Sequence, residues 1–297
     1  MALPSLAPRA SRVTPSQLSA LVEHVRGAQR LLCVTGAGIS TPSGIPDYRS
    51  PNGSYSRGHK PMLHAEFTSS ARAQQRYWAR SFVAWRYFSR AAPNAAHLAL
   101  AELERRGWLR GGLVTQNVDG LHEAAGQRRC VDLHGRIDRV ECMRCRAVTA
   151  RAAMQTRLLE ANGALGERLS LLADSSELRA DGDMQLADEE ASAFVVPTCE
   201  ACGGLLKPAV TFFGGSVDRE RADMASAAVQ EADALLVVGS SLQVYSAYRL
   251  ARMASEQSIP IALLNTGPTR ADALASLRIE ADAAEVLPAV VSQLPSS

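Results

Sequence analysis

The sequence predicts an α/β protein, in which a Rossmann-like parallel sheet is flanked by helices and a smaller helical and zinc-binding domain is inserted. Short apolar runs typical of strands buried on both faces recur along the chain, and they end in small or hydrogen-bonding residues. Two Cys-x-x-Cys units interrupt this series. A chain of 297 residues is long enough for one large domain with an insertion.

The composition points to no strongly charged partner. The chain is 46% hydrophobic with a formal net charge of +2, so we expect no nucleic acid partner, and no apolar run approaches a membrane span in length. Residues 1–13 are expected to form a flexible tail. A targeting presequence is the alternative, because Arg9 and Arg12 precede the first acid, Glu23. We therefore expect a cytoplasmic monomer, with the mitochondrial matrix as the alternative location.

An amphipathic helix is expected to come first, because Thr14 can cap it, Pro15 suits its first turn and apolar residues follow at helical spacing. The first buried strand is expected over Leu31–Val34. Glycines at 36 and 38 would let a diphosphate approach the backbone. Thr41 stands where the dinucleotide fingerprint has its third glycine, so a standard dehydrogenase is not predicted.

A turn-rich loop over 43–46 follows and would carry Asp47 and Arg49 over the same pocket. The whole stretch, Gly-Ala-Gly-Ile-Ser-Thr-Pro-Ser-Gly-Ile-Pro-Asp-Tyr-Arg over 36–49, resembles the opening signature of the sirtuins, the NAD-dependent protein lysine deacylases. The resemblance extends from Gln29 to about Leu287. Its details, including Gly-Ser-Ser-Leu-Gln-Val-Tyr-Ser over 239–246, are most similar to the class II, sirtuin-4-like branch.

Two further strands are expected to end in reactive groups. Leu113–Thr115 leads into Gln116, Asn117 and Asp119, and Val131–Leu133 leads into His134. Ligands of open parallel sheets bind beyond the carboxyl ends of the strands, and an imidazole that titrates near neutrality suits a general base. The resemblance implies that His134 is the catalytic base, helped by Asn117 and Asp119 at the nicotinamide ribose. It implies a structural role for His122.

Strands over 234–238 and 259–264 complete this ligand edge. The first ends in Gly239, Ser240 and Ser241. The resemblance implies that these residues contact phosphate and ribose and that a residue near the C-terminus, Ala283 here, caps the adenine. The full set of residues implied to bind NAD is Gly36, Ala37, Gly38, Ser40, Asp47, Tyr48, Arg49, Gln116, Asn117, Asp119, Gly239, Ser240, Ser241, Asn265, Thr266, Gly267 and Ala283.

The segment 76–88 is rich in aromatic and basic residues. Its aromatic residues mostly recur three to five apart, which favours a helix burying them over a nucleic-acid surface. Sirtuins carry a helical module here, beside the acyl-lysine tunnel. A tyrosine and arginine pair that marks acidic-acyl specificity is not in register, although Arg86 and Arg90 are close, so the acyl preference stays open.

Four cysteines are candidate ligands of one structural Zn²⁺: Cys142, Cys145, Cys199 and Cys202. A site closed by four thiolates has no open position for catalysis. Reduced thiols without metal are the alternative, and a zinc-dependent interaction module is the rival function for this segment. In sirtuins, the strand that follows, at 205–214 here, pairs with the substrate peptide, and Gly215 departs from the usual acid at that position.

The predicted division of the chain is a tail over 1–13, an NAD-binding domain formed by 14–49, 91–138 and 205–297, a helical module over 50–90 and a zinc-binding module over 139–204. The resemblance implies removal of acyl groups from lysine in proteins, with NAD as co-substrate. A mono-ADP-ribosyltransferase at the same site is one alternative. A non-catalytic protein that binds NAD or zinc is the other.

Overall fold

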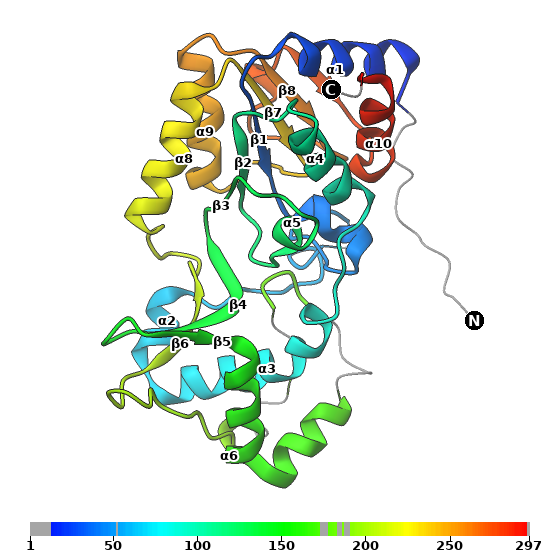
Figure 1. Cartoon of the computed structure of the whole chain (residues 1–297). Helices are drawn as coiled ribbons and strands as arrows, with labels where there is room; N and C mark the ends of the chain where they lie inside the picture. Colours follow the sequence, from blue (N-terminus) through cyan, green and yellow to red (C-terminus); the bar gives the residue numbers. More distant parts are fainter. Residues whose placement is uncertain (1–12, 52, 173–177, 183–185, 187–190, 296–297) are drawn as a thin grey trace, which may run out of the picture.

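The computed structural model describes residues 13–51, 53–172, 178–182, 186 and 191–295, and it shows two lobes, each built around its own sheet (Figure 1). The tail expected over 1–13 therefore lies outside the described residues, except for Val13. No helix in the described ranges has the length and apolar content needed to cross a membrane.

The larger lobe contains a six-stranded sheet with the order β3-β2-β1-β7-β8-β9, and all its neighbouring strands are parallel. The sheet confirms the predicted Rossmann-like core, and each of the five strands expected there is present. Its strands are β1 (Leu31–Thr35), β2 (Gly112–Thr115), β3 (Cys130–Asp132), β7 (Ala234–Val238), β8 (Ile261–Leu264) and β9 (Leu277–Ile279).

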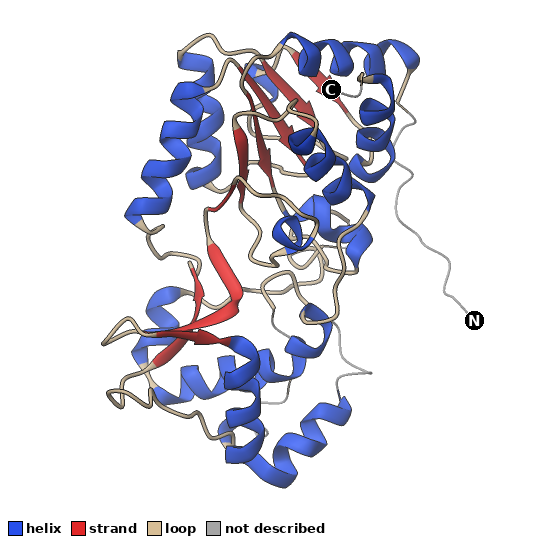
Figure 2. Cartoon of the chain, viewed as in Figure 1, coloured by secondary structure: helices blue, strands red, loops and turns tan. Residues whose placement is uncertain are grey.

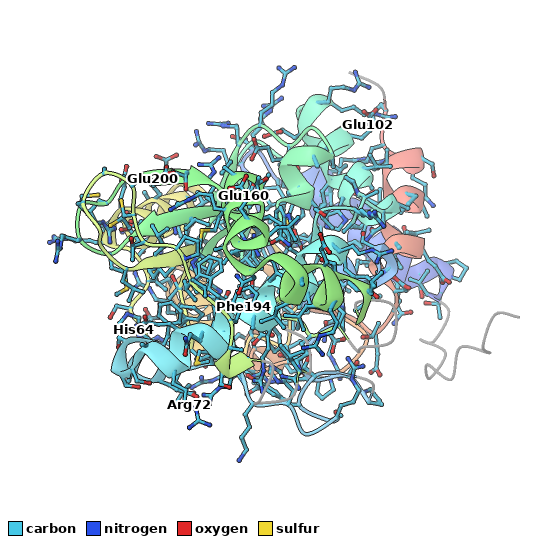
Figure 3. The ribbon with its side chains drawn as sticks, turned by 90° about the horizontal axis from the view of Figure 1, so that it is seen from below. His64, Arg72, Glu102, Glu160, Phe194 and Glu200 are labelled. Carbon is cyan, nitrogen blue, oxygen red and sulfur yellow. The ribbon has the colours of Figure 1, made fainter. Side chains whose placement is uncertain are left out.

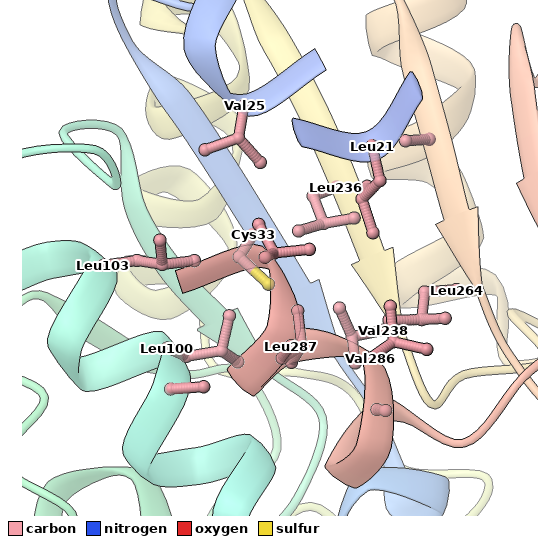
Figure 4. Packing of buried hydrophobic residues seen from close by; sticks show 14 of the residues in the cluster. Leu21, Val25, Cys33, Leu100, Leu103, Leu236, Val238, Leu264, Val286 and Leu287 are labelled. Carbon is pink, nitrogen blue, oxygen red and sulfur yellow. The ribbon is translucent and has the colours of Figure 1, made fainter. Parts of the chain in front are cut away.

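Helices cover both faces of this sheet (Figure 2). Leu31 and Cys33 of β1 pack toward one group of helices, whereas Leu32 and Val34 pack toward the other, as the alternation of a strand requires. Figure 4 shows Cys33 in the first of these cores, beside Leu100 and Leu287. The first group is α1 (Pro15–Gly27), α4 (Ala95–Arg105) and α10 (Ala283–Gln293), and the second is α8 (Arg219–Glu231) and α9 (Tyr245–Glu256).

The starts of α1 and α4 follow from their caps. Thr14 and Gln17 form a reciprocal capping box at α1, with Pro15 in the first turn, as predicted. The side chain of Asn94 accepts from the backbone N–H of Ala96 at the start of α4. Both helices are therefore stabilised at their N-terminal ends.

The smaller lobe contains a three-stranded antiparallel sheet with the order β5-β4-β6. Its strands are β4 (Gly135–Cys142), β5 (Val148–Ala150) and β6 (Leu206–Val210), and its helices are α2 (His64–Ser69), α3 (Ala71–Phe88) and α6 (Arg151–Leu172), which is kinked at Gly163. The expected NAD-binding segments 91–138 and 205–297 thus include part of β4 and all of β6, which the structure puts in the smaller sheet. Apolar runs do not specify which sheet a strand joins, because pairing depends on distant partners.

The aromatic segment forms α3 and buries most of its rings, which supports the core interpretation. Tyr77, Trp78 and Phe82 are each at most 3% exposed. The Phe82 ring lies 5.6 Å from that of Phe194, a fully buried residue that Figure 3 shows near the middle of the small lobe, seen from below. The guanidinium of the buried Arg151 lies 5.3 Å from the centroid of the Trp78 ring.

Two glycine-bearing loops of the large lobe pack directly against each other. The backbone N–H of Gly38, in η1 (Ala37–Ser43), donates to the carbonyl of Gly239 at 2.8 Å. A Cβ on Gly38 would lie 2.9 Å from that carbonyl oxygen, and one on Gly36 would lie 2.8 Å from Ser240 Cβ. In the structure these glycines admit the loop after β7, and the approach of a diphosphate to them stays a prediction.

Replacing Gly239 by alanine is expected to lower the free energy of unfolding by roughly 2–4 kcal/mol. Gly239 has φ +58°, and its added Cβ would lie 2.4 Å from the backbone nitrogen of Ile39. Chemical denaturation measures the change. Gly27→Ala is the matched control, because nothing lies within 4 Å of a Cβ there. Equal stability of the two variants would contradict the prediction.

Candidate active site

Polar side chains from three strand ends form one hydrogen-bonded network at the carboxyl edge of the large sheet. Gln116 Nε2 donates to Ser240 Oγ at 2.7 Å, which joins the loops after β2 and β7. Asn117 Nδ2 donates to Ser40 Oγ at 3.0 Å, and Ser40 Oγ donates to Asp119 Oδ2 at 2.7 Å. The predicted convergence of these tips is therefore present around β1, its two neighbours and η1.

A buried chain of hydroxyl groups lies behind Asn117. The Asn117 backbone N–H donates to Thr115 Oγ1 at 3.1 Å, and Thr35 Oγ1 donates to Thr115 Oγ1 at 2.9 Å. His122 is the second residue of the short helix α5 (Leu121–Ala124) and is 2% exposed, and its Nε2 lies 2.9 Å from Thr35 Oγ1. Burial lowers the pKa of His122 to about 3, so it stays neutral, consistent with a structural role.

His134 lies where the chain passes from one lobe to the other. The preceding residue, Leu133, donates its N–H to the carbonyl of Thr115 in the large lobe, and the carbonyl of His134 accepts from Thr211 N–H, next to β6. Gly135 follows with φ +84°, and an added Cβ would meet the Ala209 carbonyl oxygen at 2.1 Å. Main-chain hydrogen bonds to both lobes thus fix the position of His134.

The imidazole of His134 has a defined tautomer. Nδ1 lies 3.0 Å from the carbonyl oxygen of Gln116, which can only accept, so Nδ1 carries the hydrogen. Nε2 then has the lone pair and lies 2.8 Å from Ser246 Oγ, whose hydroxyl donates to it. Burial lowers the pKa of His134 below its usual 6.5, so the ring is neutral and Nε2 is basic at neutral pH.

The loops after β8 and before α10 extend the edge. Gly239 N–H donates to the Leu264 carbonyl at 2.9 Å, and Arg270 N–H donates to the Ser241 carbonyl at 2.9 Å. Asn265 Nδ2 donates to the Gly267 carbonyl at 2.8 Å, which folds the loop carrying Thr266, upstream of η2 (Asp272–Leu274). Ala283 is the first residue of α10, which packs against η1.

The loop after η1 turns on itself and links the lobes. Asp47 Oδ1 accepts from the N–H groups of Arg49 and Ser50, which fixes the turn. The ring of Tyr48 lies 5.6 Å from that of Phe213, in the segment after β6 where substrate pairing is expected, and the Arg49 guanidinium lies 5.1 Å from the centroid of the Tyr55 ring. Asp47 and Arg49 thus shape this loop, which we name the 47–59 loop.

The long insertion also reaches the 47–59 loop. Ala180 N–H donates to Ser54 Oγ at 3.1 Å, and His59 Nε2 lies 3.1 Å from Asp181 Oδ2. The other acids that the sequence groups in this insertion, at 183 and 188–190, lie outside the described residues. A cavity of about 270 Å³ opens nearby, lined by Ser43, Gly44, Ile45, Arg86, Tyr87, Arg90 and Ala91.

Four thiols of the small lobe form the candidate metal centre. The sulfur atoms of Cys142, Cys145, Cys199 and Cys202 all lie within 4.8 Å of one another. Sulfur atoms at the corners of a tetrahedron about 2.3 Å from a central Zn²⁺ are separated by similar distances. The set fits one structural zinc ion, as predicted, and Gly204 allows the close approach, since its Cβ would lie 2.8 Å from Cys142 Sγ.

Ser246 is the contact that sequence reasoning missed. It was noted only as part of the motif over 239–246, although its place in the first turn of the helix after β7 puts it at the ligand edge. The hydroxyl groups of Thr35 and Thr115 were also missed, because they end strands that the pattern describes as buried and apolar.

The parallel sheet, the polar network at its carboxyl edge and the four-cysteine centre define a nucleotide-dependent enzyme with a structural metal module. Comparison with known protein families identifies the class of this enzyme. The Sir2 family profile matches residues 36–246. The chain belongs to the Sir2 family, which confirms the predicted class, the NAD-dependent protein deacylases.

Individual relatives agree. The chain is 50% identical over 266 residues to the NAD-dependent protein deacylase SIR4 of Monosiga brevicollis, covering 89% of this chain and 85% of that protein. It is 47% identical over 285 residues to the human mitochondrial NAD-dependent protein lipoamidase sirtuin-4, covering 95% and 88%. A solved structure of Sir2 with a p53 peptide and NAD⁺ matches with a TM-score of 0.70 at 26% identity, covering 93% and 98%.

The purified protein is expected to contain one zinc ion per chain, and Cys199→Ser is expected to lose it and to lower the melting temperature by several degrees. Elemental analysis and thermal denaturation measure the two effects. Cys130→Ser is the control, because Cys130 lies in β3, away from the four-cysteine centre. A full zinc content in Cys199→Ser would refute the assignment.

Proposed function

We propose that this chain removes acyl groups from lysine side chains of proteins with NAD as co-substrate, giving nicotinamide and O-acyl-ADP-ribose. The observation that carries the proposal is the neutral imidazole of His134, whose basic Nε2 lies at the same sheet edge as the Asn117 and Asp119 network. Bound NAD supplies an electrophilic ribose carbon, to which the acyl oxygen adds as nicotinamide leaves.

The chain's own residues supply positioning and one proton acceptor. Asn117 and Asp119, already fixed through Ser40, offer an amide and a carboxylate to the nicotinamide and its ribose. His134 Nε2 takes the proton of a ribose hydroxyl, so that this oxygen can attack the acyl-bearing carbon. The 47–59 loop covers the reacting groups and excludes water, with its turn held by the Asp47 carboxylate.

The proposed protein substrate is an acylated-lysine peptide that pairs with the segment after β6. The Leu63–His64 backbone already pairs with Phe213 on one side, since His64 N–H donates to its carbonyl at 2.9 Å. The peptide would take a remaining side of this segment, as in strand addition. The comparison structure with a p53 peptide supports this class of partner. Gly215 offers no side chain to that peptide.

The finer assignments are also proposals. The name of the human relative supports a lipoyl-lysine substrate among the candidate acyl groups and supports the mitochondrial matrix as the alternative to the cytoplasm. We propose a monomer as the working unit, because the described network and the metal centre are each formed by a single chain.

A panel of lysine acyl-peptides, including acetyl and lipoyl, is expected to release nicotinamide and to lose the acyl group in the presence of NAD. His134→Ala is expected to slow acyl loss roughly 10²-fold or more, because the proton acceptor is gone. Mass spectrometry of the peptides and of O-acyl-ADP-ribose measures both. A gain of ADP-ribose on protein without acyl loss would instead establish the transferase alternative, and unchanged turnover in His134→Ala would eliminate the proposed base.

The rate constant kcat/KM for NAD is expected to be independent of pH above 6.5 and to fall below it with a slope of one. The base acts only when neutral, and burial lowers the pKa of His134 below 6.5 in the folded protein, so protonation begins only in that acidic range. Initial rates between pH 5 and 8 give the profile. An inflection above pH 6.5 would contradict this account of His134.

A further inference from the structure

We infer that Ser246 is a positioning residue for the catalytic base: its hydroxyl holds the Nε2 edge of His134 in the direction from which a ribose hydroxyl must approach. This inference rests on the proposed function. It begins from the 2.8 Å separation of Ser246 Oγ and His134 Nε2. Together with the bond from Nδ1 to the Gln116 carbonyl, this contact anchors both ring nitrogens, so neither rotation nor flipping of the imidazole is free.

Ser246 is itself held in place. It is the second residue of α9, a helix of 12 residues in which Ala247, Leu250 and Ala251 are buried against the sheet. Residues on the first turn of a packed helix have little backbone freedom, so only the side-chain rotamer of Ser246 can change. The Ser246 backbone therefore stays in place, while the hydroxyl can point in different directions according to its rotamer.

Besides pointing to His134, the Ser246 hydroxyl can point into a small cavity. A space of about 30 Å³ is lined by Leu133, Val217, Ala222, Ala225, Ser246, Arg249 and Leu250. It lies beside the residue that precedes His134, on the α8 and α9 side of the sheet. It has room for one water molecule, with the Ser246 hydroxyl and the Arg249 guanidinium as polar neighbours. The Arg249 guanidinium is held by a 2.6 Å hydrogen bond that it donates to Ser226 Oγ.

The two directions correspond to two stages of the reaction. Nε2 has one lone pair, so it accepts from either Ser246 or the ribose hydroxyl. Before the substrate binds, Ser246 occupies the lone pair and keeps it directed into the site. When the ribose hydroxyl replaces it, the Ser246 side chain turns into the cavity, where water and Arg249 are its neighbours. The ribose O–H bond then breaks as the Nε2–H bond forms, and Ser246 takes no part in this transfer.

Two variants separate this role from packing. Ser246→Ala removes the hydroxyl and is expected to slow O-acyl-ADP-ribose formation roughly 10-fold at saturating NAD, because the base is less well oriented. Exchange of labelled nicotinamide into NAD precedes the proton transfer and is expected to change less than about 2-fold. Ser246→Thr keeps the hydroxyl, and the cavity accommodates its methyl group, so product formation should recover to within about 3-fold of the wild type.

Controls and spectroscopy complete the test. Ser255→Ala removes a hydroxyl from the last turn of the same helix, α9, and should leave both steps unchanged. In the wild type, the ¹⁵N chemical shift of His134 Nε2 should be that of a hydrogen-bonded acceptor, and in Ser246→Ala it should move toward an unbonded one. Thermal denaturation shows that each variant is folded.

The inference is overturned if Ser246→Ala forms product at the wild-type rate, if exchange and product formation fall together, or if Ser246→Thr loses as much as Ser246→Ala. Each of these outcomes leaves the proposed function intact, provided the wild type deacylates and His134→Ala does not. If the wild type releases no acyl group, or if His134→Ala matches it, the proposed function itself fails.

Discussion

The active-site edge depends on the direct packing of two backbone loops, the one after β1 and the one after β7. Gly36 N–H donates to the Val238 carbonyl, and Gly38 N–H donates to the Gly239 carbonyl. This contact brings Ser40 and Ser240 to the same side, where Gln116 and Asn117 from β2 can reach them. Without the close approach, the three loops could not form one network, because side-chain hydrogen bonds need separations near 3 Å.

The base is built where the two sheets meet. β3 ends in the large sheet at Asp132, β4 begins in the small sheet at Gly135, and His134 occupies the crossing. The 47–59 loop crosses the same boundary, through the Tyr48 and Phe213 rings and through Ser54 and Ala180. Any rearrangement of the small lobe would therefore move the imidazole of His134 through its own backbone.

Local signals could be predicted from the sequence, whereas pairings between distant segments could not. The strand ends at Thr115 and Val238 were correctly located, and the end predicted at Val34 lies one residue before the actual end at Thr35, because a buried run followed by glycine or polar residues is a short-range pattern. The four cysteines were grouped for the same reason, since the Cys-x-x-Cys spacing is local. The sheet that β4 and β6 join, and the loop that Gly38 faces, depend on the tertiary fold. The same is true of the contact between Ser246 and His134, whose partners are 112 residues apart in the chain.

Burial alone does not distinguish the two histidines that follow strands at this edge. His122 and His134 both have pKa values lowered by burial, so both are neutral at pH 7. They differ in the surroundings of the ring nitrogen that carries the lone pair. The hydrogen of the Thr35 hydroxyl goes to Thr115, so His122 Nε2 donates to Thr35 Oγ1, and the His122 lone pair is on Nδ1, which is buried with no hydrogen-bond partner among the described residues. The His122 ring also packs 4.8 Å from that of His97. His134 Nε2 instead meets a hydroxyl beside a cavity. A neutral imidazole becomes a usable base only when a substrate hydroxyl can reach its lone pair. The lone pair of His122 is enclosed by the protein, whereas that of His134 faces a single hydroxyl that can turn aside.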